Sequence, residues 1–254
     1  MSETRIQTFP GLEELSHAAA ARFTALARER AQQGKTFAAA LSGGTTPRTF
    51  LEILASPEFS QRIPWESVHL FQVDERCVPP DNLQSNYRMI HGSLLVPVPG
   101  AAANFHRMQA EREDRDAASA EYAAEIGKAL APAEGRVPRF DLIFLGLGGD
   151  GHAASLFPGS AALAESSRWV CPNYVEKLQM HRLTLTYPVL NAAGEIVFLV
   201  SGSGKAEILR QVLEGPRNPE SYPAQGIQPA EGSVNWYLDG PASRLLNPRH
   251  RKNS

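Results

Sequence analysis

Short apolar runs alternate with helical stretches along almost the whole chain, and this alternation limits the possible folds more than any other feature. Strands buried on both faces read as nearly continuous apolar runs, and a helix between two such strands makes them parallel. The strand-like runs lie at residues 36–44, 68–76, 140–148, 182–187, 195–204 and 234–239. The helical patterns lie at residues 11–33, 46–56, 85–95, 114–130 and 205–215. We therefore predict an α/β fold with a mainly parallel sheet and helices on both faces.

One domain accounts for all 254 residues. No linker and no shift of composition divides the chain, and its length is sufficient to bury a large core. We predict a single domain over residues 1–254, in which residues 247–254, NPRHRKNS, form a disordered basic tail.

The charge, the N-terminus and the cysteines argue against several classes of protein. A net charge of −2 provides no positive field for nucleic acid or membrane phosphates. Residues 1–16 lack the pattern of a secretory signal, and no run approaches the roughly 18 apolar residues that span a bilayer. Cys77 and Cys171 match no zinc pattern. We expect a soluble cytoplasmic protein with neither a nucleic-acid nor a membrane partner.

Chemically conspicuous motifs follow four of the predicted strands. These motifs are LSGGTTP at 41–47, VDER at 73–76, GLGGDGH at 146–152 and SGSGK at 201–205. In open parallel sheets, ligands bind beyond the carboxyl ends of the strands. We therefore expect the four motifs to converge on one site.

The glycines before His152 raise two alternatives. Gly146, Gly148 and Gly151 match G-x-G-x-x-G, but Pro158 and Gly159 close the segment where a dinucleotide site needs a long helix. The glycines are instead expected to turn the chain and to present Asp150 and His152, whose imidazole can act as a base near neutral pH. Alternatively, Asp150 only caps backbone amides and His152 is a surface residue.

Two further motifs suit an anionic group such as a phosphate. Backbone N–H groups at a glycine turn before a helix attract anions, and Lys205 adds a charge. Leu199 and Ala206 stand where a Walker A loop needs glycine and a hydroxyl, so SGSGK is no nucleotide loop. The alternatives are a simple turn with Thr46 as helix cap and a solvated lysine. The candidate ligands are Ser42, Gly43, Gly44, Thr45 and Lys205.

The VDER motif places Asp74, Glu75 and Arg76 directly after an apolar strand. Three adjacent charges there are costly unless they are solvated or paired, so a solvated loop and a functional site both remain open. His152 has no second histidine at ligand spacing, and no G-x-S-x-G elbow occurs. We therefore expect neither a metal nor a serine nucleophile.

Together, the four motifs resemble the 6-phosphogluconolactonase family, within the wider group that includes the glucosamine-6-phosphate isomerases. The resemblance extends over nearly the whole chain and includes VDERCVPPDNLQSNY, FDLIFLGLGGDGHAASLFPG, RLTLTY and YPAQGI. It implies a single domain with a Rossmann-like parallel sheet, without a cofactor or metal. The implied reaction is hydrolysis of 6-phospho-D-glucono-1,5-lactone to 6-phospho-D-gluconate in the oxidative pentose phosphate pathway.

The resemblance also implies roles for individual residues. His152 matches the base that activates water, with Asp150 beside it in the GDGH motif. Asp74 and Arg76 match a segment that lines the pocket near the sugar ring. Gly43, Gly44, Thr45 and Lys205 match the sugar-phosphate clamp, which Arg182 is expected to join. The implied partner is a small sugar phosphate, and the chain is expected to be a monomer or a weak homo-oligomer.

Two rival functions remain. Glucosamine-6-phosphate deaminases continue the DGH motif to a glutamate five residues beyond the histidine, where this chain has Phe157. Glu75 is the one candidate for an acid that compensates for the missing glutamate. A non-catalytic sugar-phosphate sensor is disfavoured, because it would not need to keep all four of the residues His152, Asp150, Asp74 and Arg76.

Overall fold

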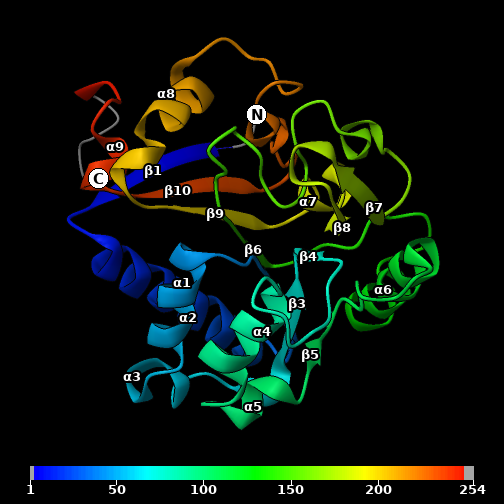
Figure 1. Ribbon diagram of the computed structural model, residues 1–254. Helices are drawn as coiled ribbons and strands as arrows, with labels where there is room; N and C mark the ends of the chain where they lie inside the picture. Colours follow the sequence, from blue (N-terminus) through cyan, green and yellow to red (C-terminus); the bar gives the residue numbers. More distant parts are fainter. Residues whose placement is uncertain (1–2, 249–254) are drawn as a thin grey trace.

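A seven-stranded parallel sheet forms the centre of the molecule, with the strand order β1-β10-β9-β6-β2-β3-β5 (Figure 1). The structure is a computed structural model that describes residues 3–248. The strands are β1 (Glu3–Phe9), β2 (Phe37–Leu41), β3 (Val68–Gln72), β5 (Phe105–His106), β6 (Leu142–Leu145), β9 (Glu195–Val200) and β10 (Ser233–Asp239). The predicted mainly parallel sheet in a single α/β domain is confirmed.

Helices cover both faces of this sheet, as predicted (Figure 1). One face carries α1 (Leu12–Gln32), α2 (Thr45–Leu54), α3 (Pro57–Ser60), α4 (Asn86–Ile90) and α5 (Pro99–Ala102). The other carries α6 (Arg115–Leu130), α7 (Tyr187–Leu190), α8 (Ala206–Glu214) and α9 (Gly240–Ser243). A π-helical turn, η2 (His91–Leu95), extends α4. The 3₁₀ turns are η1 (Trp65–Ser67), η3 (Ala161–Ala164), η4 (Glu176–Leu178), η5 (Ser203–Lys205) and η6 (Pro223–Gly226).

The hydrophobic core consists of two layers, one on each side of the sheet. Successive side chains of a strand point to opposite faces. In β6, Leu142 and Phe144 therefore pack with α1 and α2, whereas Ile143 and Leu145 pack with α6 and α8. This burial on both faces explains why the strands read as continuous apolar runs.

A second sheet, antiparallel and three-stranded, lies beside the first. It contains β4 (Asp74–Arg76), β8 (Met180–Leu185) and β7 (Val170–Val175). The single strand predicted for 68–76 was wrong at its end, because β3 stops at Gln72 and the DER residues pair with β8. Strand β7 was not predicted, because Pro172 interrupts its pattern.

Other differences from the sequence-based expectations are local. Helix α2 begins at Thr45 with Gly44 at the cap position, so Thr46 is not its cap. Strand β1 was missed, and it pairs with the last strand of the chain, β10. Residues 249–254 of the predicted tail lie outside the described residues.

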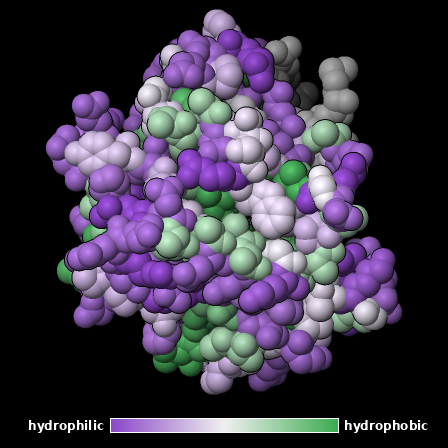
Figure 2. Space-filling model, turned by 90° about the vertical axis from the view of Figure 1, so that its right-hand side faces the viewer, coloured by the Kyte–Doolittle hydropathy of each residue, from purple (hydrophilic) through white to green (hydrophobic). Residues whose placement is uncertain are grey.

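No helix within residues 3–248 is long and apolar enough to cross a membrane. Hydrophilic residues cover most of the face shown in Figure 2.

Candidate active site

The four motifs follow four neighbouring strands of the parallel sheet. In the order β9-β6-β2-β3, these strands are followed by SGSGK, GGDGH, SGG and VDER. Because the strands are parallel, all four motifs emerge at the same edge of the sheet. The predicted convergence of the motifs is confirmed at the level of the fold.

Asp150 and His152 are in direct contact in the loop after β6. Nδ1 of His152 lies 2.5 Å from Oδ1 of Asp150, and both side chains are about one-quarter exposed. This hydrogen bond holds the pKa of Asp150 well below its usual range, despite partial burial. An ionised Asp150 can only accept, so a neutral His152 carries its proton on Nδ1 and leaves Nε2 free as a base.

The glycines of this loop provide room for the imidazole. A Cβ on Gly148 would lie 2.0 Å from Nδ1 of His152, and Gly151 has a φ of +83°, which favours glycine. The ring of His152 also stacks on Phe157, with the ring centroids 3.9 Å apart. The glycine pattern therefore shapes a histidine turn, and no long helix follows it as a dinucleotide site would require.

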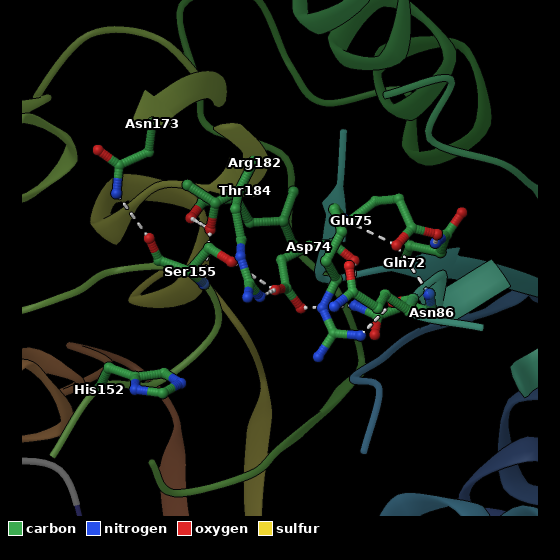
Figure 3. A network of polar contacts seen from close by, with 12 residues as sticks. Gln72, Asp74, Glu75, Asn86, His152, Ser155, Asn173, Arg182 and Thr184 are labelled. Carbon is green, nitrogen blue, oxygen red and sulfur yellow. Dashed lines mark hydrogen bonds and ion pairs between the residues drawn. The ribbon is translucent and has the colours of Figure 1, made fainter. Parts of the chain in front are cut away.

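Hydrogen bonds link the histidine loop to the VDER strand. Ser155 Oγ, fully buried, donates to Oδ2 of Asp74 at 2.6 Å. Asn86 Nδ2 donates to the main-chain oxygen of Asp74 at 2.8 Å and lies 3.3 Å from its Oδ1 (Figure 3). The Asn86 side chain in turn occupies the space that a Cβ on Gly43 would need. Three of the four motifs are thus in contact through Ser155 and Asn86.

Two guanidinium groups face the same side of the small sheet as Asp74. Arg76 of β4 is paired in register with Arg182 of β8, and like charges directly opposite each other repel. Nε of each arginine is buried without a hydrogen-bond partner. Arg182 Nη1 lies 3.9 Å from Oδ2 of Asp74, and burial lowers the pKa of Arg182. This face therefore has unmet capacity to bind an anion.

Arg182 was expected to join Lys205 in the phosphate clamp, but its contacts in the structure are with other residues. Arg182 lies against Asp74 and over the ring of Phe157, with its Cζ 5.5 Å from the ring centroid. Lys205 ends the η5 turn instead, where burial lowers its pKa and the charge of Asp150 opposes that change. Two cationic positions therefore border the loop that carries His152.

The glycine loop after β2 matches an anion site in two respects. Gly44 adopts a φ of +113° at the cap of α2, and the helix N-terminus follows at Thr45. Ser42, only 5% exposed, has a buried Oγ without a hydrogen-bond partner. Asp239, at the end of β10, fixes the start of the SGSGK loop, because its carboxylate accepts hydrogen bonds from Ser201 Oγ and from the Gly202 N–H.

Several polar residues of the site were not predicted from the sequence. Ser155 lies inside the ASLFP part of the histidine motif, and Asn86 lies inside QSNY, but neither pattern predicts a role for these side chains. Asn173 and Thr184 support Ser155 from the small sheet, at 2.8 Å and 3.2 Å. Among the described residues, no cluster of three or more His, Cys, Asp or Glu could hold a metal ion.

Comparisons with known proteins agree with this geometry. The sequence model of a family described as "Glucosamine-6-phosphate isomerases/6-phosphogluconolactonase" matches residues 10–236. A 6-phosphogluconolactonase of Synechocystis sp. is 40% identical over 82% of this chain and 84% of its own length. The chloroplastic 6-phosphogluconolactonase 3 of Arabidopsis thaliana is 35% identical over 89% of this chain and 70% of its own. The structure of 6-phosphogluconolactonase from Trypanosoma cruzi superposes with a TM-score of 0.84, at 26% identity, over 97% of this chain and 98% of that one.

Proposed function

The chain belongs to the family of glucosamine-6-phosphate isomerases and 6-phosphogluconolactonases, and we propose that it hydrolyses 6-phospho-D-glucono-1,5-lactone with His152 as the base. The activity is 6-phosphogluconolactonase, a lactone hydrolase of the pentose phosphate pathway. One contact is the main support for His152 as the base. Asp150 binds Nδ1 of His152 at the carboxyl end of β6, which leaves Nε2 free to accept a proton.

In the proposed reaction, His152 transfers one proton from the attacking water to the ring oxygen of the lactone. Nε2 of His152 removes a proton from water as the water oxygen attacks the lactone carbonyl carbon. The tetrahedral intermediate then breaks its bond to the ring oxygen, and the imidazolium returns the proton to that oxygen. The new carboxyl group, which carries the second proton of the water, ionises to solvent and gives 6-phospho-D-gluconate. The ionised Asp150 holds the ring of His152 and stabilises the imidazolium formed midway.

The remaining residues bind and orient the substrate. The oxyanion is stabilised by Arg76 or by backbone N–H groups of the glycine turns, a type of interaction worth about 10²–10³ in rate. The phosphate binds the loop formed by Ser42, Gly43, Gly44 and Thr45, together with Lys205. Arg182 joins this clamp from β8, and its unpartnered buried Nε supports an anionic ligand.

Phe157 distinguishes this function from the deaminase reaction. The phenyl ring lies on His152, at the position where deaminases have a proton-carrying glutamate, and phenylalanine cannot carry a proton. Glu75 does not replace that acid, because its carboxylate is engaged by Gln72 Nε2 and by the Asn86 and Tyr87 backbone N–H groups. Glucosamine 6-phosphate should therefore release no ammonia above background.

The decisive experiment follows hydrolysis of freshly made lactone through a coupled dehydrogenase, with spontaneous hydrolysis subtracted. His152→Ala should lower kcat by about 10²–10⁴ while its unfolding transition stays close to that of the wild type. Near wild-type kcat in this variant would reject the base, and steady release of ammonia from glucosamine 6-phosphate would reject the lactonase. Activity should also survive prolonged chelation.

The cellular setting is proposed from the sequence and varies among relatives. We propose a cytoplasmic monomer or weak homo-oligomer, although a named relative is chloroplastic. Light scattering of the purified chain across a range of concentrations measures the oligomeric state directly.

A further inference from the structure

Asn86 lies between the loop predicted to bind the phosphate and the strand that carries Asp74. Its side chain is 2% exposed and belongs to the first turn of α4. Its amide group has one hydrogen-bonding end and one end without a partner. Nδ2 donates to the main-chain oxygen of Asp74 at 2.8 Å and lies 3.3 Å from Oδ1 of the same residue. Oδ1 is buried with no hydrogen-bond partner.

The unpartnered Oδ1 of Asn86 lies against Gly43. A Cβ on Gly43 would come within 1.8 Å of that oxygen and 2.3 Å of the Asn86 Cγ. Gly43 is not among the glycines with positive φ, so its lack of a side chain makes room for Asn86 and is not required by its backbone conformation. A buried carbonyl oxygen without a partner is destabilising, and an apolar residue at this position would avoid that cost.

Glu75 fixes the backbone of Asn86. Oε1 of Glu75 accepts the Asn86 N–H at 2.7 Å, and Oε2 accepts the Tyr87 N–H at 2.7 Å. Ser85, which caps α4, also donates its Oγ to Glu75 at 3.1 Å. The start of α4 is therefore held rigidly, so that the Asn86 side chain has a defined direction between the two loops.

These contacts connect Gly43, in the loop proposed to bind the phosphate, with Asp74 through the side chain of Asn86. We propose that Asn86 is a positioning residue that holds Asp74 in register with the phosphate loop, so that binding of the phosphate raises kcat as well as affinity. Binding energy from a remote group accelerates a reaction when it is used to orient the reacting centre. The proposal rests on the proposed lactonase function and adds the route by which the phosphate acts.

The kinetic test compares two substrates, the 6-phosphorylated lactone and the unphosphorylated glucono-1,5-lactone. In the wild type, kcat should be higher for the phosphorylated substrate. Asn86→Ala should lower kcat for that substrate by about 10²-fold, a loss typical of misplaced reacting groups, and should leave kcat for the unphosphorylated lactone nearly unchanged. The ratio of the two kcat values is a readout that a merely destabilising substitution does not move.

Asn191 provides a matched control. It is another partly buried asparagine that ties loops together, since Nδ2 donates to the Gly226 oxygen at 3.0 Å and Oδ1 accepts the Gln228 N–H at 2.7 Å. It precedes β9 and so lies at the opposite end of the strands from the four motifs. Asn191→Ala should lower stability and leave the kcat ratio unchanged. Equal loss of kcat on both lactones in Asn86→Ala, or a change in KM alone, would overturn the proposal.

A second measurement tests the contact without reference to catalysis. Gly43→Ala in the wild-type background should lower Tm by about 5 °C, because its Cβ collides with Asn86. In the Asn86→Ala background the same substitution should lower Tm by less than half as much. Additive effects would overturn the proposal even if the chain proved not to be a lactonase, whereas absence of lactone hydrolysis alone would overturn the proposed function.

Discussion

Two buried charges on opposite sides of strand β4, the Glu75 carboxylate and the Arg182 guanidinium of the neighbouring strand β8, differ in how many partners they have. On one face, the Glu75 carboxylate accepts from five donors, Gln72 Nε2, Ser85 Oγ and the backbone N–H groups of Arg76, Asn86 and Tyr87, all within 3.1 Å. On the other face, Arg182 has a 3.9 Å ion pair with Asp74, lies over the ring of Phe157 and has an unpartnered Nε. Figure 3 shows the two groups on either side of the strand.

This difference separates a structural carboxylate from a binding site. Donors that surround Glu75 compensate for its burial, even though burial raises its pKa. On the Arg182 side, the guanidinium is desolvated, its Nε has no hydrogen-bond partner and its ion pair with Asp74 is long, and burial lowers its pKa. Poorly paired buried charges cluster at functional sites, where a ligand can compensate them. We expect substitutions on the Glu75 face to affect stability and those on the Arg182 face to affect activity.

The largest effect is expected at Glu75. Glu75→Ala should lower the free energy of unfolding by about 3–5 kcal/mol, because it leaves buried donors without an acceptor. Urea unfolding measures this loss. Glu75→Gln keeps the shape of the side chain but loses acceptor capacity, so its stability should lie between those of the wild type and Glu75→Ala. A loss below about 1 kcal/mol in Glu75→Ala would show that the Glu75 carboxylate is not needed for stability.

Substitution of Arg182 should have the opposite profile. Arg182→Met should lower kcat/KM by about 10²-fold, which corresponds to about 2.7 kcal/mol, through loss of an anion contact. Stability should stay the same or increase, because removal of a poorly paired buried cation relieves its desolvation cost. The coupled lactone assay and urea unfolding on the same preparation measure both. A strongly destabilised Arg182→Met variant would break the distinction between the faces.

Ser155 should have an intermediate effect on both properties. Ser155→Ala removes a 2.6 Å hydrogen bond to Asp74, and bonds to charged groups are worth about 1.5–3 kcal/mol. We expect a loss of about 2 kcal/mol, divided between stability and kcat/KM. Ser160→Ala is a suitable comparison, because its Oγ accepts from Asn173 and does not contact Asp74. Similar kinetics in the two variants would place Ser155 outside the site.

The smallest effect is expected for the pH dependence of stability, through His106 in β5 at the edge of the main sheet. Burial, with the charge of His69, lowers the pKa of His106 from 6.5 to about 4. Below about pH 6.5, His106 is protonated in the unfolded chain but stays neutral in the folded protein. Stability is therefore lost as pH falls from 6.5 toward 4. Unfolding at pH 7.5 and pH 5 should show this loss to be about 1 kcal/mol smaller in His106→Asn. An identical pH dependence in both proteins would show that His106 does not contribute.

The sequence by itself determined the fold class and most of the contact between Asp150 and His152. Apolar runs separated by helical patterns specify buried parallel strands, and strand ends specify where ligands bind. Asp150 and His152 are two residues apart, so local glycine geometry alone brings them together. Such features depend on neighbours along the chain, which is why they can be read from it.

Only the tertiary structure decided which distant residues meet. Ser155 and Asp74 are 81 residues apart, and their bond depends on β3 and β6 flanking β2 in the sheet. The departure of Asp74–Arg76 into a second sheet, the location of Arg182 beside Asp74 and the role of Asn86 depend in the same way on packing between separate elements. No local pattern encodes such pairings, because the sequence around each residue determines its own strand or helix and not the distant residue that it contacts.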